Sequence, residues 1–275
     1  MRQPLHLLLP TALAALFLTL TGCAQRAPAP WPGVLQTLLP ADALLLGERH
    51  DAPQHQALQR EAVTWLAERG ELAALVLEMA EQGHGTQGLP PDASEAAVQA
   101  ALAWNDGAWP WQQYGPVAMA AVRAGVPVLG GNLPRRELRT ALTDATLDAL
   151  LSPAALERQR QAVRDGHCGL LPEARVPGMA RVQVARDLRM AQTIGAAQHP
   201  GRVVLLVAGA AHVKRSLGVP VHLPEKITSK VVIKHTGIAE AAIKNEANML
   251  RQTPDLPPDD ACAPLRQRWQ AAPAR

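Results

Sequence analysis

Residues 203–212 read VVLLVAGAAH, an unbroken apolar run that ends in glycine and histidine. Similar short runs recur along the chain, at residues 43–46, 72–77, 126–129 and 231–234. Segments with the apolar spacing of amphipathic helices separate them, at residues 53–66, 117–124, 135–150, 153–164 and 179–197. Short buried strands that alternate with such helices predict an α/β fold, in which helices cover both faces of a mostly parallel sheet.

The size and charge of the chain narrow the class of protein. It has 275 residues, 48% of them hydrophobic, which is enough for one large domain or at most two small ones. The formal net charge is +3, and it falls to +2 without a leader whose only charged side chain is Arg2. Such a near-balance argues against a protein that binds nucleic acid.

Residues 1–22 are predicted to be a lipoprotein signal peptide. Arg2 supplies a positive charge, and Leu7–Leu20 is an apolar run too short for a stable membrane span. The run ends in Leu20-Thr21-Gly22-Cys23, which resembles a bacterial lipobox; an ordinary secretory signal followed by a chance cysteine is the alternative. Cys23 would carry the lipid, residues 23–40 would form a proline-rich tether, and residues 41–275 would fold in water beside a membrane.

Export also bears on location and on the other cysteines. Ala24 follows Cys23, where an aspartate would suggest inner-membrane retention, so we expect a periplasm-facing lipoprotein of the outer membrane. In that oxidising compartment, a disulfide between Cys168 and Cys262 is expected to pin the C-terminal tail to the body. No C-x-x-C-H motif occurs in the sequence, which excludes covalent c-type haem.

Polar residues follow four of the predicted strands at the point where each strand ends. The runs continue into Gly47-Glu48-Arg49-His50, Glu78-Met79, Gly130-Gly131-Asn132 and Gly209-Ala210-Ala211-His212. The carboxyl ends of parallel strands open on one edge of a sheet, where ligands usually bind. We therefore expect these polar side chains to converge: Glu48, His50, Glu78, Asn132 and His212. The structural alternatives are histidines that only lock loops and carboxylates that cap helices or pair with arginine.

A second cluster is aromatic. Four of the seven aromatic residues outside the leader lie close together, as Trp104, Trp109, Trp111 and Tyr114. They could form a small satellite core, or a flat apolar wall for a planar ligand. In the second case Tyr114 would supply a phenolate, a recognised axial ligand of haem iron. Ligand carboxylates could then meet nearby arginines, namely Arg123, Arg135 and Arg136.

Asp187 is a candidate supporting residue. It shares a helix face with Gln183 at i,i+4 spacing. Its carboxylate could orient a histidine of the site, although such residues more often cap helices or pair structurally.

Taken in order, these segments resemble the ChaN family of bacterial haem-binding lipoproteins, within the larger grouping of TraB/Tiki proteins. The pieces that carry the resemblance span residues 41–262 and include 46–51, 78–79, 114–116, 132–135, 167–173, Gln183, 186–187, 209–212 and 218–220. The resemblance implies a periplasm-facing lipoprotein that binds haem non-covalently and carries or stores it in iron uptake. It also implies haem held between two protomers, hence a homodimer when haem is bound, with Tyr114 on the iron.

Two hypotheses of different classes follow. For a haem carrier without catalysis, the candidate haem-binding residues are Tyr114, Trp111, Arg135, His50 and His212. The alternative is a metal-dependent hydrolase, which the resemblance to Tiki-type proteases implies. There His50 and His212 would bind a metal ion, and Glu48 or Glu78 would bind it or act as general base. We favour the haem carrier, because the aromatic cluster and the lipobox suit it and kinship of fold says little about activity.

Overall fold

A six-stranded sheet forms the centre of the molecule. The computed structural model describes residues 30–239, 241–257, 260 and 262–271, so the predicted signal peptide and Cys23 lie outside the described residues. The strands are β1 (Ala43–Glu48), β2 (Leu72–Glu81), β3 (Val128–Asn132), β4 (Val203–Gly209), β5 (Ser229–Thr236) and β6 (Met249–Thr253). They lie in the order β3-β2-β4-β1-β5-β6, and every neighbouring pair is parallel. The predicted α/β class is confirmed.

The two central strands are buried at every position, as expected of strands covered on both faces. Successive side chains point to opposite faces, so Leu44 and Leu46 of β1 join one hydrophobic core and Leu45 joins the other. The weakest predicted strand, at 231–234, is β5, which pairs with β1 along five residues. The edge strand β6 was not predicted, because only one of its residues is buried.

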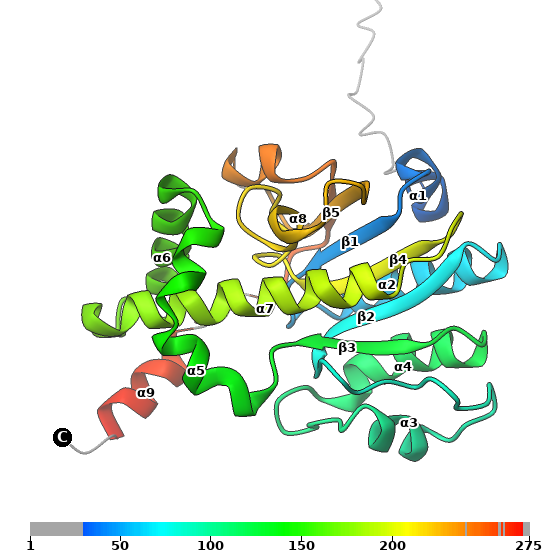
Figure 1. Cartoon of the computed structure of the whole chain (residues 1–275), viewed down its shortest axis with the longest axis horizontal. Coiled ribbons are helices and arrows are strands. Elements are labelled where there is room, and N and C mark those ends of the chain that lie inside the picture. The colour runs from blue at the N-terminus through cyan, green and yellow to red at the C-terminus, as the bar shows by residue number, and fades with distance from the viewer. Residues whose placement is uncertain (1–29, 240, 258–259, 261, 272–275) are drawn as a thin grey trace, which may run out of the picture.

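Helices cover both faces of the sheet (Figure 1). One face packs against α1 (Trp31–Leu38), α2 (Pro53–Glu68), α3 (Glu95–Ala101) and α4 (Trp111–Arg123). Because α1 is buried in this core, residues 31–38 belong to the folded body and not to the predicted tether over 23–40. The other packs against α7 (Val176–Ala196) and the short α8 (Val219–His222). Local chemistry sets several helix starts: Pro53 is the first residue of α2, and the Ser94 side chain accepts a hydrogen bond from the Ala97 N–H at the start of α3.

A smaller helical lobe adjoins the sheet and contains α5 (Leu138–Thr143), α6 (Pro153–Gly166) and the first half of α7. The single helix predicted over 135–150 is wrong: the segment consists of α5 flanked by two 3-10 turns, Arg135–Glu137 and Ala145–Leu150. Asp144 causes the second break, because its side chain accepts a hydrogen bond from the Thr146 N–H and caps the following turn.

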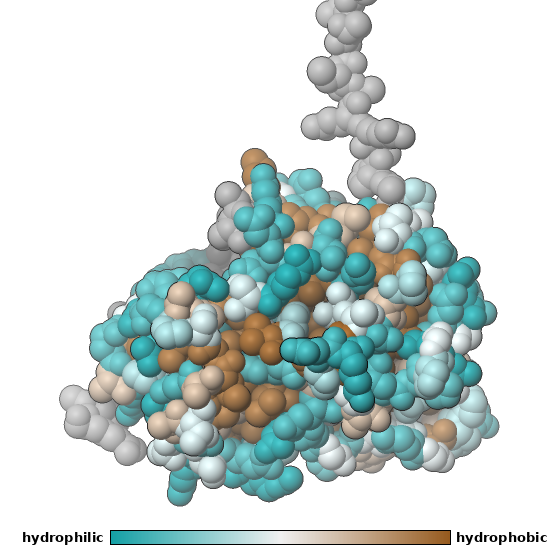
Figure 2. All heavy atoms as spheres, turned by 45° about the horizontal axis from the view of Figure 1, so that its top comes forward, coloured by the Kyte–Doolittle hydropathy of each residue, from teal (hydrophilic) through white to brown (hydrophobic). Residues whose placement is uncertain are grey.

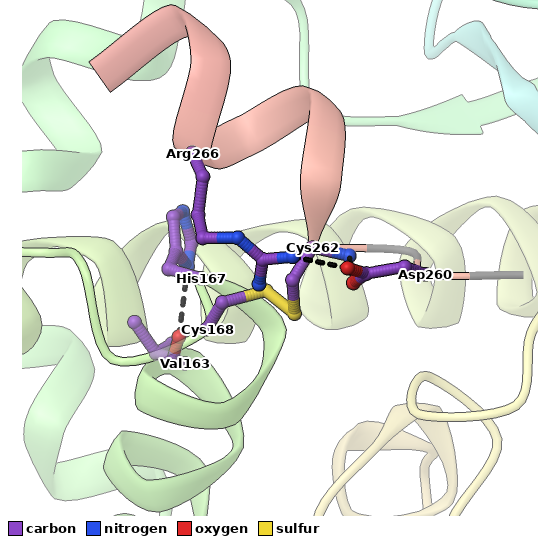
Figure 3. The surroundings of a disulfide bond; sticks show 6 residues. All are labelled: Val163, His167, Cys168, Asp260, Cys262 and Arg266. Carbon is purple, nitrogen blue, oxygen red and sulfur yellow. Dashed lines mark hydrogen bonds and ion pairs between the residues drawn. A yellow bond between two sulfur atoms is a disulfide. The ribbon is translucent and has the colours of Figure 1, made fainter. Parts of the chain in front are cut away.

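A disulfide joins the helical lobe to the C-terminal segment (Figure 3). Cys168, just after α6, bonds to Cys262 directly before α9 (Ala263–Ala271), across 94 positions of sequence. The predicted pairing is thus present. Beside it, Arg266 forms an ion pair with Asp260. The bond holds the end of the described chain against a lobe that it would otherwise contact weakly.

The described surface is mixed in character. Figure 2 shows apolar side chains that reach the surface in patches surrounded by hydrophilic ones. Large hydrophobic side chains are exposed on separate elements, at Leu142, Leu150, Val221 and Ile238. In the part of the chain that the structure describes, no helix is both long and apolar enough to cross a membrane.

Candidate functional site

The carboxyl ends of β1, β2 and β4 bring four of the predicted residues together. His50 Nδ1 lies 2.8 Å from Glu48 Oε1, and His50 Nε2 lies 4.0 Å from Glu78 Oε2. On the other side of Glu78, its Oε1 lies 3.3 Å from His212 Nε2. These four side chains form one continuous cluster of charge, which we call the strand-end cluster. It joins residues more than 160 positions apart in sequence.

His212 is the most enclosed histidine of the cluster. Its Nδ1 lies 2.6 Å from Asp187 Oδ1 on α7, and its Nε2 faces Glu78, so both ring nitrogens meet carboxylates. Burial acts to lower the pKa of His212, but Glu78 and Asp187 outweigh it and raise that pKa to about 10. The imidazole is therefore cationic and balances one of two buried negative charges. Asp187 orients a site histidine, one of the two roles considered for it.

Glu78 and Asp187 respond differently to the same histidine. Burial acts to raise the pKa of Glu78, but His212, His50 and the Gly209 N–H at 2.7 Å together hold it below its usual range. Burial dominates at Asp187 and raises its pKa to about 6 in spite of His212. Glu78 is thus the firmly ionised acid at the centre of the cluster.

His50 is the accessible member of the cluster. Its side chain is 40% exposed, and its ring packs edge-on against Trp109 with centroids 4.8 Å apart. Burial acts to lower the pKa of His50, yet the hydrogen bond with Glu48 and the charge of Glu78 raise it overall. Gly209 leaves space for the ring, because a Cβ atom there would lie 2.8 Å from His50 Nε2.

Tyr114 lies beside the cluster but is enclosed. Its side chain is 0% exposed, and its hydroxyl donates a hydrogen bond of 2.8 Å to Glu48 Oε1, 3.2 Å from His50 Nδ1. Burial and the adjacent Glu48 raise the pKa of the phenol, so the protonated form is favoured. The rings of Trp104 and Trp109 pack against it. To bind iron, this hydroxyl would have to leave Glu48.

The other predicted residues lie in more varied places. Trp111 is buried and donates from Nε1 to Glu95, and its ring belongs to the main hydrophobic core on the α2–α4 face of the sheet, not to a separate satellite core. The Asn132 side chain donates a hydrogen bond to the Glu78 carbonyl and accepts one from the Leu133 N–H. The first of these bonds links the end of β3 to β2. Arg135 is exposed and lies 3.7 Å from Glu81. Arg123 lines a separate groove between α2 and α4.

Helix α2 and strand β5 add polar residues that the sequence analysis missed. Gln56 and Gln59 both donate to Glu48 Oε2, and their i,i+3 spacing just after the first G-x-x-H motif was the available signal. Lys234, at the end of the apolar run of β5, is 1% exposed, and its Nζ has no hydrogen-bond partner among the described residues. Burial lowers the pKa of Lys234 to about 7, against the opposing charge of Glu48.

A hollow of about 310 Å³ lies beside Trp109, the ring against which His50 packs. Its apolar wall includes Met79, Trp109, Leu133 and Leu138, and its cationic side chains are Arg135 and Arg186. The hollow lies where the carboxyl ends of β2 and β3 meet the helical lobe. A concave site that combines apolar and polar side chains, at this edge of a parallel sheet, is a common position for a ligand.

The histidines and acids of the cluster are already bonded to one another. Across residues 30–239 and the described parts beyond, no group of three or more His, Cys, Asp or Glu has an arrangement that could hold a metal ion. Both ring nitrogens of His212 lie close to carboxylates. Of the ring nitrogens of His50 and His212, Nε2 of His50 is the one without a close hydrogen-bond partner among the described residues. His50 Nε2 is therefore the accessible ring nitrogen of the strand-end cluster.

The fold defines a parallel α/β protein, and its strand-end cluster lies at the carboxyl ends of the strands, where such proteins usually bind ligands. Comparison with known protein families identifies the relatives of this chain. The family model described as haem-binding uptake, Tiki superfamily, ChaN matches residues 34–223, more than half of the chain. The chain therefore belongs to the ChaN family, which confirms the resemblance, and membership supports a function in haem binding and uptake. β5 and Lys234 lie beyond the matched region.

Solved structures give two likenesses. ChaN of Campylobacter jejuni, described with cofacial haem binding, is 22% identical, with a TM-score of 0.64 over 78% of this chain and 89% of that one. The type III effector HopBA1 is 15% identical, with a TM-score of 0.46 over 78% of this chain and 88% of that one, which is too weak to carry an argument. No curated protein matches the chain.

Proposed function

We propose that this protein is a haem-binding lipoprotein that carries or stores haem non-covalently in bacterial iron uptake, without catalysis. The observation that carries the proposal is the half-exposed His50, which packs against Trp109, a wall residue of the adjoining hollow, in a member of a haem-binding uptake family.

The residues at this edge fit haem in kind. Haem, when bound, supplies an iron that accepts an imidazole or a phenolate as axial ligand. The apolar side chains of Trp109, Met79 and Leu133 would shield the apolar face of the group from water. Glu48 fixes the orientation of the His50 ring through Nδ1, which leaves Nε2 directed away from that carboxylate.

Two residues are candidates for the axial ligand. His50 is accessible as the structure stands, whereas Tyr114 is bonded to Glu48 beneath it. Tyr114 stays a prediction, because a shift of its hydroxyl away from Glu48 is required. His212 and Trp111 are buried and bonded to acids, so neither reaches a ligand from its present position.

A hemin titration of the purified protein tests the proposal. Wild type is expected to shift the Soret band of hemin, and His50→Ala is expected to abolish or move that shift. Tyr114→Phe removes only the hydroxyl, and the exposed His199→Ala is the matched control. Loss of the shift in Tyr114→Phe with His50→Ala intact would assign the ligand to the phenolate. Absence of any hemin binding by wild type would overturn the proposal.

The proposal also includes an anchor and a dimer. A lipid on Cys23, after removal of residues 1–22, would hold the body at the outer membrane facing the periplasm. We expect Cys23→Ser to move the protein from the membrane fraction to the soluble one. We further expect hemin to convert a monomer of the soluble form into a homodimer, measured by light scattering with and without hemin; an unchanged mass would remove the dimer from the proposal.

The metal-dependent hydrolase is not proposed. It would require His50, His212 and Glu78 to share one ion, and in the described structure His212 instead lies between Glu78 and Asp187. No observation of the site favours hydrolysis over binding.

A further inference from the structure

Arg186 stands out among the charged residues of the hollow. It lies on α7, lines the hollow and is half-buried. Its Nε is buried and has no hydrogen-bond partner among the described residues. A guanidinium carries five N–H donors in a planar fork, and donors that are withdrawn from water without acceptors raise the free energy of the folded state.

The neighbouring arginines of the same helix are bonded to acids. Arg181 lies 2.8 Å from Asp148, and Arg189 lies 2.6 Å from Glu137. Within the described residues, no comparable ion pair involves Arg186. The acid next to it in sequence, Asp187, is committed to His212 at 2.6 Å. Arg186 feels the charge of Asp187 but forms no ion pair with it, so this cation of α7 lines the hollow without a directly bonded acid.

The charges that line the hollow do not cancel. Its titratable lining residues are Glu81, Arg135 and Arg186. Glu81 lies 3.7 Å from Arg135, and this exposed pair neutralises itself. One positive charge is left over, on Arg186, opposite an apolar wall that includes Trp109. The missing partner is thus an anionic group attached to an apolar body.

We infer that Arg186 binds a carboxylate of the ligand through its guanidinium fork. The inference rests on the proposed function, in which that carboxylate is a propionate of haem. Arginine suits this role because its two parallel N–H groups match a carboxylate geometrically, and a lysine ammonium does not. Arg186 would then select porphyrins with a free carboxylate, independently of the iron and its axial ligand.

The test uses an iron-free porphyrin to separate this contact from iron ligation. Quenching of tryptophan fluorescence, to which Trp109 of the hollow contributes, reports binding of protoporphyrin IX and of its dimethyl ester. Arg186→Gln is expected to weaken binding of protoporphyrin IX about tenfold, the effect of losing one charge-assisted contact. The dimethyl ester lacks the carboxylate that Arg186 would bind. Wild type and Arg186→Gln are therefore expected to bind the ester with affinities within about twofold of each other.

Two further variants control the measurement. Arg123→Gln removes the same charge from the separate groove between α2 and α4 and is expected to leave binding unchanged. Arg186→Lys keeps the charge without the fork, and we expect an intermediate loss; it carries the test if Arg186→Gln does not fold. Circular dichroism of each variant confirms folding.

Three outcomes decide the inference. A loss specific to Arg186→Gln and to the free acid supports it. Equal affinities of Arg186→Gln and Arg123→Gln, or equal losses for acid and ester, overturn it while the proposed function stands. Failure of wild type to bind hemin and protoporphyrin IX alike would overturn the proposed function and this inference together.

Discussion

The ends of β1 and β4 carry the same G-x-x-H spacing but place their histidines in opposite environments. The side chain of His50 is 40% exposed and leans on Trp109, whereas that of His212 is 9% exposed and lies between two buried carboxylates. The motif supplies a glycine at the strand end and a histidine three residues on. Elements far away in sequence decide whether that histidine faces solvent or the interior.

The two motifs also contact each other in the folded chain. Gly209 of the second motif provides the space that the His50 ring of the first occupies. Glu78 lies between the histidines, with one oxygen 3.3 Å from His212 and the other 4.0 Å from His50. The buried histidine therefore holds the acid that the exposed histidine faces.

The largest expected difference between the motifs is in stability. His212→Ala should lower the free energy of unfolding by about 3–5 kcal/mol, because it leaves two buried carboxylates without their cation. His50→Ala should cost less than about 1 kcal/mol, since its side chain is well exposed. Urea unfolding of both variants measures the difference. Similar losses of unfolding free energy in His212→Ala and His50→Ala would show that the different burial of the two histidines does not affect stability.

A second prediction concerns pH. The pKa of His212 is raised to about 10 when folded, so its stabilising effect is present below pH 6.5 and is lost as pH rises toward 10. Lys234 has a pKa lowered to about 7, so the cost of burying its charge disappears over much of the same range. The two effects oppose each other between pH 7 and pH 10, and wild-type stability should vary little there.

Lys234→Met exposes the contribution of His212. With the opposing effect removed, stability should fall by roughly 1 kcal/mol for each pH unit between 7 and 10. At pH 7 the variant should also be more stable than wild type, because a buried ammonium without a partner is replaced by an apolar chain. Lys230→Met on the same strand is the control. A flat profile in Lys234→Met, measured by urea unfolding, would contradict this account of His212.

The smallest expected effects concern the glycines of the two motifs. A Cβ at Gly47 would meet Val213 and the backbone of Ala210, so Gly47→Ala should cost about 1–3 kcal/mol. A Cβ at Gly209 would meet the end of the His50 ring, which can move, so Gly209→Ala should cost about 1 kcal/mol or less. Its effect should be seen in the hemin spectrum instead. An unaltered spectrum would place the ligand away from His50.

Much of the fold could be read from local pattern. The apolar runs at 43–46, 72–77 and 203–207 predicted β1, β2 and β4, because a strand buried on both faces leaves an uninterrupted apolar stretch. The disulfide between Cys168 and Cys262 followed from the export signal and the cysteine count. The helix predicted over 135–150 was wrong because a side-chain cap at Asp144 outweighed apolar spacing.

The site could be predicted less completely from the sequence. Parallel topology was enough to place Glu48, His50, Glu78 and His212 at one edge, since strand ends share an edge whatever the loops do. The burial of Tyr114 and of Lys234 could not be predicted, because it depends on neighbours that only the folded chain supplies. For Tyr114 these neighbours include the rings of Trp104 and Trp109 in the segment before α4. Exposure is a property of the packed layers, and one residue's neighbours in sequence do not determine it.

The sequence by itself determined a parallel α/β sheet, the edge where its polar residues gather and the kinship with haem-binding proteins. The tertiary structure alone decided that His212 is enclosed, that His50 is accessible and that Arg186 is left without an acid. The physical reason is that periodicity and strand-end glycines act within a few residues. The pairing of charges, in contrast, depends on distances between helices and strands that only the folded chain brings together.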